Sequence, residues 1–428
     1  MSRRQPAATM ILAASIVAVA PGLAGCQPGE TARHVIGTLK FGADLPLSGD
    51  DAADGVPARN ALELALRQAG LLCGQSSLKD TCVRLQLVAL DDVREGIHDP
   101  AKGADNLQQL VADPNVVGVV GGLYDSVARS EIPAANVGGL ALLSPGATDE
   151  CLTQEPADGH CAGLAARLRP SGANTFFRLI TTQLDEGAAA ADLLTRTLGK
   201  RRVYVVNDQT KFGQAVAGTF AERVARDGGT VVDSSDLGGF DPSQPADFAG
   251  RVGRAQSLGA EAIYYAGSSV EAGAALRREM MSRMPQAPML GTDRLANTQF
   301  AKSAAAGARG SYYTVAGPYP PRIREAATFS RDYRRAYGAD VGRFSLASFD
   351  AAGVLAAAIR RAIDAAGGAR PSRAQVLDQV RRTSEFHGAM GTTSFDARGD
   401  TALKLVTAYQ WLAAGDRAGQ VVAQLSVN

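Results

Sequence analysis

Small and polar residues follow two short apolar runs in the middle of the chain, an arrangement that can bind a small molecule. Residues 116–120 form the first run, which a Gly-Gly pair ends, and residues 140–143 form the second, which the turn SPGAT at 144–148 ends. Each run has the length of a strand buried on both faces, and Asp125 or Ser126 can cap a helix between them. Parallel strands joined by a helix bring both turns to one edge of a sheet, where free backbone N–H groups and helix N-termini bind ligands. This stretch therefore predicts a ligand-binding edge.

Residue patterns typical of catalysis are missing from the sequence. There is no G-x-S-x-G nucleophile motif, no G-x-x-x-x-G-K-[ST] loop and no G-x-G-x-x-G after a strand. Asp91 and Asp92 are interpreted as solvated residues at a strand end. No histidine lies three or four residues from another, so we expect surface or loop positions, rather than metal ligands, for His34, His98, His160 and His387. The pattern favours a binding protein without catalytic residues, metal or cofactor, and an enzyme acting on its bound ligand is the minor alternative.

Length and composition indicate two domains with hydrophobic cores. The chain has 428 residues, of which 46% are hydrophobic and 20% are charged, and this is typical of a soluble protein larger than one ordinary domain. The formal net charge is +1, and no basic stripe with interleaved aromatic residues is present. Both features argue against nucleic acid as a partner.

The N-terminus has the pattern of a lipoprotein signal peptide over residues 1–26. Arg3 and Arg4 precede an apolar run from 7 to 20, and Leu-Ala-Gly then leads to Cys26. The run is short for a membrane span, and small residues before a cysteine suit the peptidase that leaves an acylated cysteine as the first residue. We expect Cys26 to anchor the protein to the outer side of the cell membrane, with residues 27–36 as a tether. An uncleaved anchor or an ordinary signal peptide is the alternative.

Four further cysteines form two close pairs in the sequence. Cys73 and Cys82 bracket one polar loop, and Cys151 and Cys161 bracket another. Outside the cytoplasm such cysteines form disulfides, and the short loops favour bonds within each pair over the other two pairings. A metal site is the weaker alternative, because only His160 is near and neither pair has the two-residue spacing of zinc knuckles.

Strands and helices alternate along the rest of the chain, which indicates parallel α/β sheets with helices on their faces. The first predicted strand, 38–45, runs into a turn with Ser48, and a helix follows from about Pro57. Polar turns with Ser269 and Asp293 also follow predicted strands. Further strands are expected at 84–90, 203–206, 230–232, 262–265, 289–290, 406–411 and 421–425.

The SPGAT turn, the Gly-Gly turn before it and the later SFDA and FDARGD segments resemble the leucine/isoleucine/valine-binding family, the amino-acid-binding receptors of ABC transporters. The likeness spans nearly the whole mature chain. It implies a type 1 periplasmic-binding-protein-like fold, in which two doubly wound parallel-sheet lobes are joined by a hinge of three crossings. The implied first lobe comprises residues 37–178 and 317–391, and the second comprises residues 179–316 and 392–428.

The resemblance also implies a function. A monomer outside the cytoplasm would capture a small amino-acid-like ligand between its lobes and deliver it to the membrane subunits of an ABC permease. A ligand-sensing subunit that signals to a membrane receptor is an alternative of a different class.

The resemblance assigns roles to residues at the strand ends. The turn with Gly146 and Thr148 would hold the carboxylate of an amino acid, Asp293 would pair with its ammonium group, and Phe212 would line the cleft. An ordinary core position at a helix start is the equal alternative for Phe212. The full set of implied ligand-binding residues is Ser48, Asp54, Asp125, Ser126, Gly146, Thr148, Phe212, Ser269 and Asp293.

Three positions depart from the family pattern. Asp54 stands where an aromatic residue usually covers the ligand, Ser268 or Ser269 replaces a second aromatic residue, and Asp125 stands where a hydroxyl usually touches the ligand carboxylate. Two carboxylates about 4 Å apart repel by roughly 4 kcal/mol at an effective dielectric constant of 20. Asp125 therefore either turns away as a helix cap or indicates a different ligand, and a cationic ligand would suit the three acids Asp54, Asp125 and Asp293.

Overall fold

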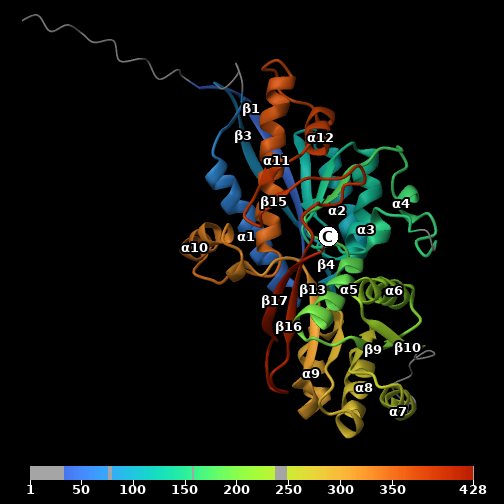
Figure 1. The fold of residues 1–428 in the computed structure, drawn as a ribbon. Coiled ribbons are helices and arrows are strands. Elements are labelled where there is room, and N and C mark those ends of the chain that lie inside the picture. Colours follow the sequence, from blue (N-terminus) through green and yellow to red (C-terminus); the bar gives the residue numbers. More distant parts are fainter. Residues whose placement is uncertain (1–32, 76–79, 157–158, 237–247, 428) are drawn as a thin grey trace, which may run out of the picture.

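The computed structural model describes residues 33–75, 80–156, 159–236 and 248–427, which form two α/β lobes stacked end to end (Figure 1). The predicted signal peptide, Cys26 and most of the expected tether lie outside the described residues. Residues 34–36, which had been expected to belong to the tether, instead begin β1, where His34 pairs with Thr81 of β3. Within the described ranges, no helix is long and apolar enough to cross a membrane.

The first lobe is built on a six-stranded sheet in the order β2-β3-β1-β6-β7-β8. All neighbouring strands are parallel except β2 and β3. Continuous apolar runs such as VVGVVG in β6 are buried throughout, as expected for a parallel sheet covered on both faces. The strands are β1 (His34–Leu45), β2 (Leu72–Cys73), β3 (Thr81–Asp91), β6 (Val116–Gly121), β7 (Ala141–Ser144) and β8 (Phe176–Arg178).

Helices cover both faces of this sheet. One face packs against α1 (Ala52–Ala69), α10 (Ala326–Tyr337), α11 (Ser345–Ala365) and α12 (Arg373–Arg381). The other face packs against α2 (Pro100–Ala112), α3 (Asp125–Val137) and α4 (Leu164–Arg167). Short elements complete the lobe: β4 (Val93–Arg94), β5 (Ile97–His98), η1 (Glu150–Leu152), β14 (Phe386–His387) and β15 (Thr392–Thr393).

The second lobe is built on a seven-stranded sheet in the order β10-β9-β11-β12-β13-β16-β17. The first five strands are parallel, and β16 and β17 continue the sheet in antiparallel fashion. The strands are β9 (Arg202–Asn207), β10 (Thr230–Asp236), β11 (Ala262–Ala266), β12 (Met289–Gly291), β13 (Ser311–Ala316), β16 (Leu405–Gln410) and β17 (Gln420–Ser426).

Its helices also lie on both faces, so each lobe is doubly wound. One face packs against α5 (Gln183–Asp192), its π-helical extension η2 (Leu193–Thr197) and α6 (Lys211–Arg226). The other packs against α7 (Phe248–Ser257), α8 (Val270–Arg283), α9 (Thr298–Ala304) and η4 (Ala305–Ala308). Two short 3-10 turns, η3 (Asp293–Leu295) and η5 (Pro320–Arg322), follow β12 and β13.

The chain passes between the lobes three times, between β8 and α5, between β13 and α10, and between β15 and β16. The third crossing lies later than expected. Residues 392–402 stay on the first lobe, where Thr392 pairs with His387 and the backbone N–H of Arg178 donates to the carbonyl of Gly399 at 3.0 Å. The FDARGD turn is therefore part of the first lobe, and the chain reaches the second lobe only at Leu405.

Three other expectations differ from the structure. Strand β13 and helix α10 had not been expected, although the buried residues of α10, Ala326, Phe329 and Tyr333, recur at helical spacing. Helix α1 begins at Ala52, upstream of Pro57. Asp92 is fully buried rather than solvated, because the β4–β5 hairpin folds back beside the end of β3 and the backbone N–H of Asp92 donates to Leu45.

Candidate ligand-binding cleft

Two of the cavities formed by the described residues lie between the lobes beside the strand-end turns. The larger has a volume of about 790 Å³ and takes Pro145, Phe344 and Ala347 from the first lobe and Thr407 and Tyr409 from the second. The smaller has a volume of about 430 Å³ and brings Asp125 and Asp149 of the first lobe near Lys211, Phe212 and Arg294 of the second. Volumes of this size are typical of small-molecule sites.

The turn after β7 is the centre of the implied site, and every backbone N–H from Gly146 to Asp149 has a partner inside the protein. Thr148 and Asp149 donate to Oδ1 of Asp125 at 2.6 and 2.8 Å. Gly146 and Ala147 donate to the hydroxyl of Ser144 at 3.3 and 2.9 Å. The turn has the N–H groups to hold a carboxylate, and that carboxylate is the side chain of Asp125.

Asp125 is the first residue of α3, so the helix start points its side chain at the turn. Burial raises the pKa of this carboxyl and outweighs the N–H groups of Asp149 and Thr148, which lower it. Asp125 thus does not cap its own helix: it lines the smaller cavity, and its hydrogen-bond partners belong to the neighbouring strand end. This is a third arrangement, which the sequence alternatives did not include.

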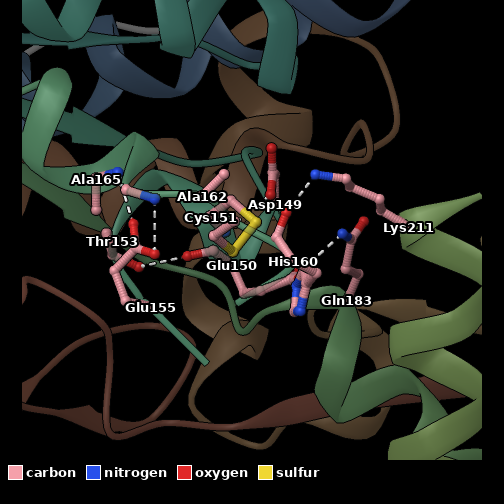
Figure 2. The surroundings of a disulfide bond; sticks show 12 residues. Asp149, Glu150, Cys151, Thr153, Glu155, His160, Ala162, Ala165, Gln183 and Lys211 are labelled. Carbon is pink, nitrogen blue, oxygen red and sulfur yellow. Dashed lines mark hydrogen bonds and ion pairs between the residues drawn. A yellow bond between two sulfur atoms is a disulfide. The ribbon is translucent and has the colours of Figure 1, made fainter. Parts of the chain in front are cut away.

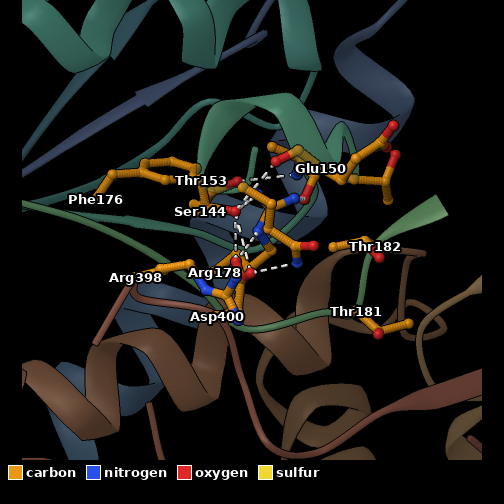
Figure 3. Close-up of polar contacts among 12 residues, drawn as sticks. Ser144, Glu150, Thr153, Phe176, Arg178, Thr181, Thr182, Arg398 and Asp400 are labelled. Carbon is orange, nitrogen blue, oxygen red and sulfur yellow. Dashed lines mark hydrogen bonds and ion pairs between the residues drawn. The ribbon is translucent and has the colours of Figure 1, made fainter. Parts of the chain in front are cut away.

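A buried arginine, Arg178, contacts the same turn and lies beside Thr153 and Asp400 (Figure 3). Arg178 of β8 donates to the carbonyl of Asp149 at 3.0 Å and to the hydroxyl of Thr153. Its Nε lies 2.8 Å from Oδ1 of Asp400, and the Arg178 side chain is fully buried. Because Asp400 lies just before the third crossing, this ion pair fixes the binding turn to the hinge.

Asp54 lies at the start of α1 and accepts a hydrogen bond from the hydroxyl of Tyr124 at 2.9 Å. The ring of Tyr124 stacks on His98 with centroids 3.9 Å apart, and Nδ1 of His98 lies 2.8 Å from Asp51. The turn after β6 thus supplies an aromatic ring to the first lobe, but neither Tyr124 nor His98 lines either of the two cavities. Sequence reasoning missed Tyr124 and His98, although Tyr124 directly precedes Asp125.

Asp293 follows β12 and is flanked by two guanidinium groups. Its Oδ1 lies 3.8 Å from Nε of Arg294, and its Oδ2 lies 3.9 Å from Nη2 of Arg343, which belongs to the first lobe. Its backbone N–H donates at 3.2 Å to Glu186, a fully buried carboxyl that also accepts from Ala316. Burial, and then the charge of Asp293, raise the pKa of Glu186. Asp293, which the resemblance assigned to the ligand ammonium group, thus already has two cationic side chains beside it.

The remaining implied residues divide into two groups. Phe212 lines the smaller cavity at the start of α6, where the Arg294 guanidinium lies 5.7 Å from its ring centroid. The three serines have other surroundings: Ser48 donates to Asp91 at 2.6 Å, Ser269 caps α8 by accepting from Ala272, and Ser126 is exposed on α3. The structure brings Asp125, Gly146, Thr148, Phe212 and Asp293 to the interlobe region.

Comparison with known proteins identifies the family. The profile of the periplasmic binding protein family matches residues 38–416. This chain belongs to that family. One relative is Leu/Ile/Val-binding protein homolog 3 of Brucella melitensis, with 24% identity over 87% of this chain and 91% of the relative. Another is Leu/Ile/Val-binding protein BraC3 of Rhizobium johnstonii, with 26% identity over 90% of this chain and 93% of the relative. A putative branched-chain amino acid ABC transporter structure from Rhodospirillum rubrum has a TM-score of 0.63 and 25% identity, and the match covers 90% of this chain and all of that one.

Periplasmic binding proteins work outside the cytoplasm, where disulfides persist. Both expected disulfides are present: Cys73–Cys82 and Cys151–Cys161. Glu150, Cys151, His160 and Cys161 lie within 4.8 Å of one another, but both sulfur atoms are used by the disulfide. The two cysteines therefore have no free thiolates to bind zinc, and only Glu150 and His160 remain as ligands in this group.

Both cysteines of the second disulfide line the smaller cavity, and Figure 2 shows the residues around this bond. Its loop touches the second lobe, because Nζ of Lys211 donates to the carbonyl of His160 at 2.9 Å. Nε2 of His160 lies 2.7 Å from Glu150, which also accepts from Gln183 at the first crossing. In this member of the family, the loop joins the two lobes on one side of the cleft.

Proposed function

We propose that this periplasmic binding protein is a lipid-anchored receptor that captures a small amino-acid-like ligand between its lobes and delivers it to an ABC permease. The anchor rests on the sequence around Cys26, and the permease rests on the family. Amino acids are the first class to test, since the relatives are named Leu/Ile/Val-binding proteins.

The observation that carries the proposal is the pair of cavities lined by strand-end turns of both lobes. The lobes have separate cores and are joined by three connections, so a hinge motion changes the cavities while each core stays intact. A ligand that contacts both lobes stabilises the closed arrangement by its higher affinity for that state.

Ligand binding and lobe closure are tested together. A thermal-shift screen of amino acids, amides, polyamines and small organic acids identifies ligands, because a ligand at 100 times its Kd adds about 2.7 kcal/mol of stability. Small-angle scattering then measures the radius of gyration with and without each hit. We expect the radius to fall on binding. A hit that leaves the radius unchanged at saturation would contradict capture between the lobes.

The cationic-ligand hypothesis stays a prediction that the same screen tests. Asp54, Asp125 and Asp293 have Tyr124, the turn N–H groups and two arginines as partners. A cation is therefore not needed to satisfy them. Binding of basic amino acids or amines in preference to other ligands would support the hypothesis nonetheless.

A further inference from the structure

The larger cavity has a charged group that the protein leaves available. Three arginines line it: Arg331, Arg334 and Arg343. Arg331 donates to Asp332 at 3.2 Å, and Arg334 donates to Asp340 at 2.9 Å. Arg343 donates no hydrogen bond to any described residue, and its nearest acid is Asp293 at 3.9 Å. Its side chain is 49% exposed, between Asp293 and the cavity.

The surroundings of Arg343 carry net positive charge. Arg294 and Arg343 share the single carboxylate of Asp293, so these three side chains together have a charge of +1. The guanidinium also lies 4.9 Å from the ring centroid of Phe344. A guanidinium has five N–H donors in a planar fork, and those of Arg343 donate to no described residue, so they can bind a carboxylate with two hydrogen bonds.

The rest of the cavity wall is mainly apolar. Phe344, Tyr319 and Tyr409 contribute aromatic rings, and the centroids of the last two are 6.4 Å apart in an edge arrangement. Pro145, Ile180, Val315, Pro318, Ile323 and Val341 add aliphatic surface. Such a wall favours the burial of an apolar body, because apolar surface is removed from water on binding.

A zwitterionic amino acid finds neither of its expected partners free. The N–H groups of residues 146–149 are bonded to Asp125 and Ser144, and Asp293 has two guanidinium groups beside it. An ammonium group placed near Asp293 would be repelled by the positive charges of Arg294 and Arg343. An ammonium group without a partner would lose its hydration, which costs free energy.

We infer that the larger cavity binds a monocarboxylate with an aromatic or branched aliphatic body and no ammonium group, with its carboxylate on Arg343. The inference rests on the proposed function and names the ligand class of the cleft. It differs from an amino-acid site in one chemical group, which makes it directly testable.

The test uses two pairs of probes that differ by the ammonium group alone: 3-phenylpropanoate against phenylalanine, and 4-methylpentanoate against leucine. Calorimetric titration of the purified protein should show each acid binding about tenfold or more tightly than its amino acid. Arg343→Gln should weaken binding of the acids by about tenfold or more, since hydrogen bonds between charged groups are stronger than those between neutral groups. The affinity of Arg343→Lys for the acids should fall between those of the natural protein and Arg343→Gln, because an ammonium group cannot bind a carboxylate with the planar fork of a guanidinium.

Arg335→Gln is the matched control, because Arg335 is an exposed arginine of α10 that does not line the cavity. It makes the same change of charge and should leave both affinities unchanged. Tighter binding of the amino acids, or acid binding that Arg343→Gln leaves intact, would overturn the inference while the proposed function stands. If none of the four probes binds, the inference also fails, and the scattering test with the wider ligand set then judges the proposed function separately.

Discussion

Oδ1 of Asp125 lies 2.6 Å from the backbone nitrogen of Thr148 and 2.8 Å from that of Asp149. A side-chain carboxylate thus occupies two N–H groups that stand at the end of a parallel strand, where they would otherwise face the cleft. The occupied turn limits what the cleft can bind, because an anion there would have to displace Asp125.

Replacing Asp125 with Ser should free these N–H groups. We expect Asp125→Ser to bind leucine about tenfold or more tightly than the natural protein, because two backbone donors become available to the ligand carboxylate. Asp125→Asn is the control: its amide oxygen can still accept hydrogen bonds from the turn N–H groups, so the binding of leucine should remain weak. Calorimetry on the three proteins measures the effect, and equal leucine affinity in all three would contradict it.

The proximity of Asp125 and Thr148 could be foreseen, since a strand–helix–strand unit must bring both turns to one sheet edge. The buried strands could also be predicted, because an unbroken apolar run such as residues 116–120 has the length of a buried strand and is too short for an independent helix. The hydrogen bond of Tyr124 to Asp54 and the place of Arg343 in the wall of the larger cavity could not be predicted. Their roles depend on partners 70 residues away for Tyr124 and in the other lobe for Arg343, and neither contact leaves a local pattern in the sequence.

The pair Arg178 and Asp400 should be essential to the stability of the first lobe. Removing one partner of a buried ion pair typically costs about 3–5 kcal/mol, because the other charge stays buried alone. We expect Arg178→Met to lower the free energy of unfolding by this amount, and Arg178→Met with Asp400→Leu to recover much of it. Urea denaturation measures both.

Arg398→Met is the control for this prediction, because Arg398 pairs with Asp396 at the surface with a side chain that is 57% exposed. Surface pairs contribute about 0–1 kcal/mol. A loss in Arg178→Met no larger than in Arg398→Met would show that the buried pair is not needed.

The proposed anchor predicts a simple change in fractionation. Stable attachment to a membrane needs more than one acyl chain, and an acylated N-terminal cysteine supplies them. Cys26→Ser should therefore move the protein from the membrane fraction to the soluble fraction, whereas Cys73→Ser with Cys82→Ser should leave it in the membrane fraction. Membrane attachment of Cys26→Ser would rule out lipidation at this cysteine.

Asp92 places an acid in a fully buried position at the end of β3. Neither carboxylate oxygen has a hydrogen-bond partner among the described residues. Burial raises its pKa to about 8, and the charges of Asp44, Asp91 and Asp51 act in the same direction, against Lys102. Asp44 shares this environment, and burial raises its pKa to about 6.

These shifts predict that the protein loses stability as the pH rises from 5 to 8. In this range the folded state keeps the proton of Asp92, whereas the unfolded chain has released it above a pKa of 3.8. Asp92 alone, by holding this proton in the folded state, makes the free energy of unfolding fall by up to about 1.4 kcal/mol per pH unit. Asp350, whose pKa burial raises to about 7, adds to the decline. Asp92→Asn removes this titratable group, so the free energy of unfolding should decline less steeply with pH. Urea denaturation at several pH values measures this. Asp113→Asn is the control: Lys40 lowers the pKa of Asp113, so that group titrates below this range and the slope should not change. A decline of equal slope in all three proteins would show that Asp92 is ionised in the folded state at pH 5.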